Sequence, residues 1–165
     1  MASVTFKENP VTLVGNEVKV GDSAPDFTVL TNDLQEVKLS DFNGVRIISV
    51  VPSVDTGVCA VQTKRFNDEV ANLDNVSVLT ISVDLPFAQA RWANEKGLEQ
   101  ARIFSDHRDL SFGEAYGVVI QELRLLSRSV FVVDSDNKIV HVEYVSEVTN
   151  HPDYEKALEA AKQAK

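Results

Sequence analysis

One cysteine, Cys59, is the residue of this chain best suited to redox or nucleophilic chemistry. It follows the segment of residues 51–58, which joins an apolar β-branched stretch to a stretch of helical periodicity. Cys59 is therefore expected in the first turn of a helix, where unpaired N–H groups and the helix dipole favour an anion. The thiolate is the reactive form of cysteine. A small buried hydrophobe is the alternative, because many free cysteines are buried and inert.

Other chemistries find little support in the residue pattern. The histidines His107, His141 and His151 are scattered and show no zinc-ligand spacing. Because the chain has no Gly-x-Gly-x-x-Gly motif and no phosphate-binding loop, we expect no nucleotide cofactor, and no cofactor or metal at all. The charged run of residues 106–109 is interpreted as surface or dimer-interface material.

The strands that would position Cys59 are short, β-branched and bounded by breakers. Buried strands are predicted at residues 45–51, 76–83 and 129–133. A partly alternating strand at 139–145 follows turn residues 134–138, which predicts a closing hairpin. Gly15-Asn16, flanked by alternating apolar residues, predicts an N-terminal hairpin within residues 11–20, and a further strand is expected at 27–30.

Helices are predicted between these strands. Cys59, Phe66, Val70 and Leu73 fall on one stripe of a helix. Further helices are expected at residues 86–96 and from Pro152 to the end. Alternating strands and helices predict an α/β domain with a mixed central sheet flanked by helices. Because no linker or repeat interrupts the chain, residues 1–165 are expected to form one domain.

Composition limits the partners. The net charge is −9, from 16 basic and 25 acidic residues. This charge repels phosphate backbones and anionic membranes, so we expect neither nucleic acid nor membrane as a partner. A lone cysteine cannot form an internal disulfide, and the N-terminus lacks the features of a secretory signal. We therefore expect a reducing, cytoplasmic environment.

Several motifs resemble those of one enzyme family. Pro52, Thr56 and Cys59 match the pattern Pro-x-x-x-Thr-x-x-Cys of peroxiredoxin active sites. Four blocks, residues 53–59, 84–89, 112–117 and 123–131, are similar to bacterial thiol peroxidases, the atypical two-cysteine peroxiredoxins. The similarity covers nearly the whole chain and implies a thioredoxin-like fold, a homodimer and no cofactor.

The resemblance also implies roles for matching residues. Cys59 would attack a hydroperoxide and become a sulfenic acid. Thr56 would offer its hydroxyl to the sulfur, Arg128 would add positive charge, and Pro52 would limit the access of water. From the residues alone, Thr56 could instead cap the helix, Arg128 could be a surface charge, and Pro52 could simply end a strand. Val58, Phe87 and Trp92 are expected to line the substrate pocket.

The chain departs from the family at one important position. The resolving cysteine of such enzymes is matched here by Ala93, so no intramolecular disulfide can form. Either an alanine has been introduced in place of a cysteine, or this protein uses an external thiol.

The expected function is thiol-dependent reduction of hydrogen peroxide and organic hydroperoxides, with thioredoxin or another thiol as reductant. Two alternatives remain. One is a peroxide sensor or redox relay, and the other is a non-catalytic thioredoxin-fold binding module, because fold alone does not separate these functions.

Overall fold

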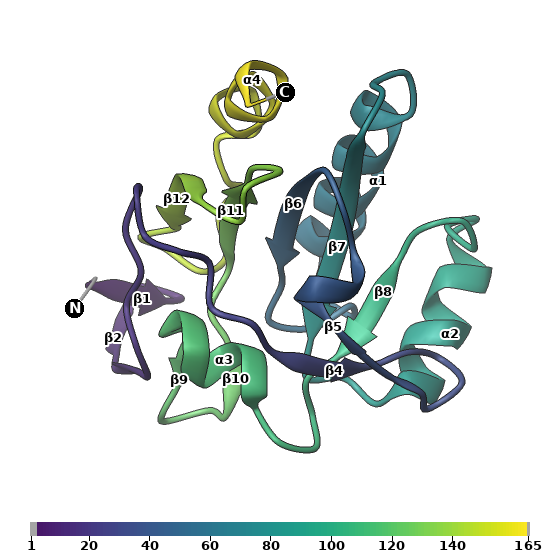
Figure 1. Ribbon diagram of the computed structural model, residues 1–165. Helices are drawn as coiled ribbons and strands as arrows, with labels where there is room; N and C mark the ends of the chain where they lie inside the picture. The colour runs from purple at the N-terminus through teal and green to yellow at the C-terminus, as the bar shows by residue number, and fades with distance from the viewer. Residues whose placement is uncertain (1–2, 165) are drawn as a thin grey trace.

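A seven-stranded mixed sheet forms the centre of the computed structural model, which describes residues 3–164 (Figure 1). Its strand order is β12-β11-β6-β7-β8-β4-β5. The strands β6, β7 and β8 run parallel to one another, and the remaining neighbours are antiparallel. The strands of this sheet are β4 (Thr28–Leu30), β5 (Glu36–Lys38), β6 (Val45–Val50), β7 (Val76–Ser82), β8 (Ile103–Ser105), β11 (Ser129–Val133) and β12 (Ile139–Tyr144).

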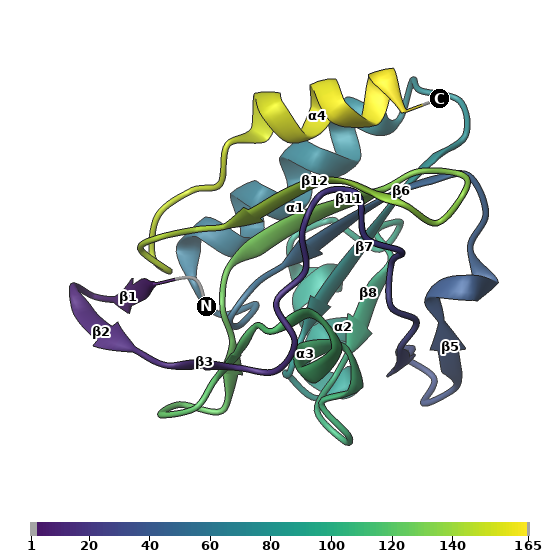
Figure 2. The same ribbon diagram turned by 60° about the vertical axis from the view of Figure 1, so that its left-hand side comes forward.

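Smaller strands and the helices surround this sheet. The strands β10 (Leu125–Leu126), β9 (Val119–Ile120) and β3 (Leu13–Val14) form a second sheet, and β1 (Val4–Phe6) pairs with β2 (Asn9–Val11). The helices are α1 (Gly57–Val70), α2 (Pro86–Glu95), α3 (Ser111–Tyr116) and α4 (Tyr154–Gln163), with a short 3-10 helix, η1 (Leu39–Asp41). Figure 2 shows α1 and α4 on one side of the central sheet and α3 on the other.

Side chains alternate between the two faces of the central strands, so the sheet separates two apolar clusters. Ile47 of β6 packs with α1 and α4 residues such as Phe66 and Leu158. Ile48, the next residue, packs on the opposite face with Phe112 of α3. All residues of β6 and β11 are buried, including the polar Arg46, Ser49 and Ser129, so apolar side chains of these strands face both sides of the sheet.

The α/β architecture and most predicted elements are confirmed. The strands predicted at 45–51, 76–83, 129–133 and 139–145 match β6, β7, β11 and β12 within one residue at each end. The closing hairpin β11–β12 is antiparallel as expected. The last helix begins at Tyr154, with Asp153 as its N-cap, so Pro152 lies just outside it. Among the described residues, no helix combines the length and apolar character needed to cross a membrane.

The N-terminal hairpin exists, but its predicted position around Gly15-Asn16 was wrong. The turn lies at Lys7 and Glu8, whose φ angles of 51° and 69° are those that a two-residue hairpin turn requires. Gly15 instead allows a close approach to α3. A Cβ on Gly15 would lie 2.6 Å from the carbonyl oxygen of Glu114.

The interpretation of residues 106–109 as surface or dimer-interface material was also wrong for Asp106, which is only 2% exposed within the single chain. Its carboxylate accepts hydrogen bonds from the backbone N–H groups of Phe112 at 3.0 Å and Gly113 at 2.8 Å, at the start of α3. Burial raises the pKa of this carboxyl to about 6, although these two bonds oppose the shift. Asp106 therefore holds the start of α3, although burial of its carboxylate away from water is unfavourable.

Candidate active site

Cys59 lies in the first turn of α1, directly after the loop that leaves the carboxyl end of β6. Its side chain is completely buried, with 0% exposure, and its backbone N–H donates to the Thr56 carbonyl at 3.2 Å. The carboxyl ends of parallel strands are a common place for sites, because the loops that follow them meet at one edge. The predicted position of Cys59 at a helix start is confirmed.

Thr56 has the backbone conformation of the α1 N-cap, but its side chain does not cap the helix. Its Oγ1 lies 2.5 Å from Cys59 Sγ and 3.2 Å from the Ser53 carbonyl oxygen. The hydroxyl has a single proton. When Cys59 is a thiolate, only Thr56 can donate in the short contact, so its proton points to the sulfur and away from Ser53. The structure therefore favours a role at the sulfur over the capping role.

Arg128 is buried rather than on the surface, with 1% exposure. Its Nη1 lies 3.5 Å from Cys59 Sγ, and its Nη2 donates to Thr56 Oγ1 at 3.4 Å. Nε donates to the Val148 carbonyl at 2.7 Å, which fixes the plane of the guanidinium. Among the ion pairs of residues 3–164, none includes Arg128. A buried cation without a carboxylate partner is costly, and the Cys59 sulfur beside it is a group that can carry a compensating negative charge.

Gln62 also belongs to this site, although the sequence did not single it out. Its Oε1 accepts from Arg128 Nη1 at 2.9 Å, and its Nε2 donates to Ser49 Oγ of β6 at 2.9 Å. Gln62 therefore holds the guanidinium between α1 and the sheet. A signal was present, since Gln62 is three residues after Cys59 and so lies on the same helix face. The stripe that predicted this helix consists of Cys59 and the apolar residues Phe66, Val70 and Leu73, so it did not include the polar Gln62.

The remaining predicted site residues are more dispersed. Pro52 is buried in the loop after β6. Ala93 and Trp92 of α2 are buried in a cluster with Val54 of the same loop.

Trp92 and Thr56 line a pocket of about 250 Å³ between the start of α1 and α2. Val58 and Phe87 do not line it, and Phe87 is 66% exposed. The structure thus brings together Cys59, Thr56 and Arg128, places Trp92 in the lining of a pocket that Thr56 shares, and leaves Phe87 exposed.

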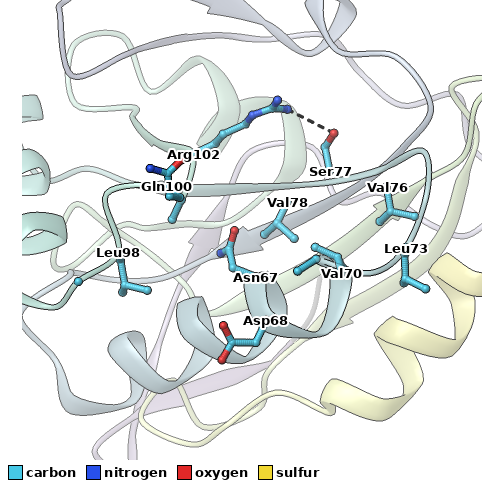
Figure 3. Close-up of a pocket in the computed structure, with 13 residues that line it drawn as sticks. Asn67, Asp68, Val70, Leu73, Val76, Ser77, Val78, Leu98, Gln100 and Arg102 are labelled. Carbon is cyan, nitrogen blue, oxygen red and sulfur yellow. Dashed lines mark hydrogen bonds between the residues drawn. The ribbon is translucent and has the colours of Figure 1, made fainter.

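A different pocket, of about 470 Å³, lies away from this site. Figure 3 shows it between the end of α1, the start of β7 and the segment before β8, where Arg102 donates to Ser77 Oγ. It contains neither Cys59 nor any of the residues expected around it. Size alone is therefore a poor guide to the reactive site here.

These features define a class of protein. A buried cysteine lies in the first turn of a helix that follows a parallel strand, and a hydroxyl and a buried guanidinium reach its sulfur. Such a site is built for thiol chemistry in a layered α/β fold.

Comparison with known proteins gives the family. Residues 19–158 match the Redoxin family. The chain is 70% identical over 165 residues to a thiol peroxidase of Halalkalibacterium halodurans, covering 99% of both chains. It is 66% identical to a thiol peroxidase of Bacillus subtilis, covering 98% of both. A crystal structure of a peroxiredoxin-like protein from Aquifex aeolicus matches with a TM-score of 0.91 and 39% identity, covering 100% of this chain and 98% of that one. The chain therefore belongs to the redoxin family and, within it, to the thiol peroxidases, and the expected thioredoxin-like fold is confirmed.

Proposed function

We propose that this protein is a thiol-dependent peroxidase in which Cys59 reduces hydrogen peroxide and organic hydroperoxides. The observation that carries the proposal is the contact of a fully buried sulfur with two donors, Thr56 Oγ1 and Arg128 Nη1. Two donors beside a thiol serve no purpose for packing, but they stabilise a thiolate and the charge that forms as an O–O bond breaks.

In the proposed reaction, the Cys59 thiolate attacks the terminal oxygen of the hydroperoxide. The O–O bond breaks, the sulfur is oxidised to a sulfenic acid, and the other oxygen leaves as water or an alcohol after it gains a proton. Arg128 and the Thr56 hydroxyl face the sulfur, so they can also donate to the peroxide oxygens. The buried ring of Pro52 would limit access of water to the same space.

The direct test is rapid mixing of the reduced protein with hydrogen peroxide and with a bulky organic hydroperoxide. We expect consumption of about one equivalent of either oxidant, with a sulfenic acid at Cys59. An unreactive Cys59 would point to a binding module. A mixed disulfide trapped with one particular protein would point to a redox relay.

Turnover requires a thiol from outside the chain, because Cys59 is the only cysteine. Thioredoxin or another thiol would attack the sulfenic sulfur with loss of water, and a second thiol would then release reduced Cys59 and a disulfide. Without such a reductant, excess peroxide should drive Cys59 to the sulfinic form.

Ala93→Cys tests the position of the missing resolving thiol. The variant should form a disulfide with Cys59 after peroxide treatment and then turn over with thioredoxin, its reductase and NADPH. Ala93 is buried in α2, so α2 or the start of α1 must open locally for the sulfurs to meet. If no such disulfide forms, the match of position 93 to a resolving cysteine is wrong. If the unmodified chain already turns over fast with thioredoxin, the external thiol attacks Cys59 directly and a thiol at position 93 is not needed.

Two further parts of the proposal concern assembly and location. The protein would act as a homodimer, and light scattering that gives the 18.2 kDa of one chain at micromolar concentration would refute this. It would act in the cytoplasm, where a free thiol stays reduced. Recovery of the protein outside the cytoplasmic fraction in cell fractionation would refute this location.

A further inference from the structure

Asp84 is a charged residue next to the site for which the proposed mechanism has no role. It lies two residues after the end of β7, which is parallel to β6, so it is at the same edge of the sheet as the loop between β6 and α1. Its carboxylate accepts three hydrogen bonds, from Ser53 Oγ at 2.9 Å, from Val54 N at 2.8 Å and from Ser82 Oγ at 2.6 Å. Two of these donors belong to the loop that precedes Cys59.

The main chain of Asp84 is itself held firmly. Its carbonyl oxygen accepts from Ser105 Oγ at the end of β8, at 2.5 Å. Ser82 Oγ, which donates to the carboxylate, also accepts from Gln89 Nε2 of α2 at 3.0 Å. The main chain of Asp84 is therefore fixed to β8, and its carboxylate is connected to α2 through Ser82.

The loop before Cys59 depends on this carboxylate. Among the described residues, the two hydrogen bonds that tie Ser53 and Val54 to another element both end on the Asp84 carboxylate. The Ser53 carbonyl in turn accepts from Thr56 N at 3.3 Å and lies 3.2 Å from Thr56 Oγ1. Hydrogen bonds thus connect the Asp84 carboxylate to Ser53, and Ser53 to the backbone of Thr56, whose hydroxyl contacts the sulfur.

Charge alone would argue against a carboxylate here. A negative group near Cys59 disfavours a second negative charge on the sulfur. Its placement is therefore better explained by geometry, because one rigid acceptor can hold a serine hydroxyl and a backbone N–H of the same loop at once.

We infer that Asp84 is a positioning residue that holds residues 53–56 in the geometry in which the Thr56 hydroxyl meets Cys59, and that it ties this loop to α2. The inference rests on the proposed function, because it assigns Asp84 to the peroxide reaction of Cys59. Loss of the carboxylate should let the loop move away from the sulfur, which both misplaces Thr56 and uncovers Cys59.

Three variants test this role: Asp84→Ala, Asp84→Asn and the control Asp26→Ala. Asp26 is a matched carboxylate because it also accepts three hydrogen bonds, from the Ser40 hydroxyl and from the backbone N–H groups of Ser40 and Phe27. None of these partners belongs to the loop before Cys59. In Asp84→Asn, the amide oxygen can still accept from Val54 N and Ser82 Oγ, and the amide N–H₂ can donate to Ser53 Oγ. The asparagine variant therefore keeps the geometry and removes the charge.

Two rates are measured for each variant, together with its free energy of unfolding. They are the rate of reaction with hydrogen peroxide in a single turnover, and the rate at which a bulky maleimide alkylates Cys59 without peroxide. Asp84→Ala should slow the peroxide reaction by about 10- to 100-fold, the usual effect of a misplacement near 1 Å, and should speed alkylation. Asp84→Asn should stay close to the unmodified protein in both rates, and so should Asp26→Ala.

Three results would overturn the inference. They are an Asp84→Ala variant that reacts like the unmodified protein, an Asp84→Asn variant as slow as Asp84→Ala, and an Asp26→Ala variant slowed to the same degree. The second would mean that the charge matters, and the third that lost stability is the cause. Failure of the unmodified protein to react with peroxide would instead refute the proposed function. The alkylation rates would then still show whether Asp84 holds the loop closed.

Discussion

Replacing Arg128 with glutamine removes the positive charge nearest to Cys59 while leaving a polar side chain that can still donate a hydrogen bond. The guanidinium lies 3.5 Å from the sulfur and is buried. At an effective dielectric constant of about 20, two unit charges at this separation attract by about 5 kcal/mol. This is an upper limit, because the guanidinium charge is spread over three nitrogens.

The expected effect on rate is smaller than this limit. Removing one donor from a site that stabilises a developing anion costs about 10²- to 10³-fold in rate, or about 2.7–4 kcal/mol. We therefore expect Arg128→Gln to slow the reaction of Cys59 with hydrogen peroxide by about 10²- to 10³-fold. Reaction with an uncharged alkylating reagent should slow as well, because the guanidinium would no longer stabilise negative charge on the sulfur.

Stopped-flow fluorescence of Trp92, the only tryptophan, can follow the reaction because this residue lines the pocket beside Thr56. Arg46→Gln is the matched control. Arg46 is also buried, but its guanidinium donates to Leu39, Phe42, Asp134 and Asn137, away from the sulfur. The control should lose stability and keep its peroxide rate. Equal rates for the Arg128 and Arg46 variants would refute the assignment of Arg128 to the reaction.

Three other predictions follow from the same contacts. Thr56→Val should slow peroxide reduction by about 10- to 100-fold, the effect of losing a hydrogen bond to a charged group. Thr56→Ser keeps the hydroxyl and should retain most of the rate in the same stopped-flow assay. Asp106 has a folded pKa of about 6 against 3.8 for the free group, so its contribution to stability is complete below about pH 4 and is lost as the pH rises through 6. In the unmodified protein, this carboxyl should lower the free energy of unfolding by about 3 kcal/mol between about pH 4 and pH 7. Urea unfolding of Asp106→Asn should not show this decrease. Trp92→Ala should change the rate with a long-chain hydroperoxide more than the rate with hydrogen peroxide, and equal changes would remove Trp92 from the substrate pocket.

The central strands and the place of Cys59 could be predicted from the sequence because they depend on local patterns. β6 and β11 are short runs rich in β-branched residues and bounded by breakers, and the helix that starts near Cys59 follows from the spacing of Phe66 and Val70. The N-terminal hairpin was misplaced because its turn uses Lys7 and Glu8, residues that do not signal positive φ angles. The glycine that does signal them, Gly15, serves a contact with α3 far along the chain.

The polar contacts of the site depend on the tertiary fold. Arg128 meets Cys59 across 69 positions of sequence, and Asp84 meets Ser53 across 31. Nothing in the local sequence around these residues indicates that they meet in the fold. The prediction for Asp106 was wrong for the same reason, because a run of charged residues is usually solvated. Its carboxylate is buried because the backbone N–H groups at the start of α3 donate to it.

The most direct measurement is mass spectrometry of the reduced protein and of Cys59→Ser after mixing each with one equivalent of hydrogen peroxide. A peroxidase that acts through Cys59 should consume the peroxide and gain a single oxygen on the peptide that contains Cys59, and Cys59→Ser should do neither. Cys59 is buried, so rapid oxidation there would support the activation that we propose for Thr56 and Arg128. Peroxide consumption by Cys59→Ser at the rate of the unmodified protein, or an unmodified Cys59 peptide after the peroxide is gone, would contradict the proposed function.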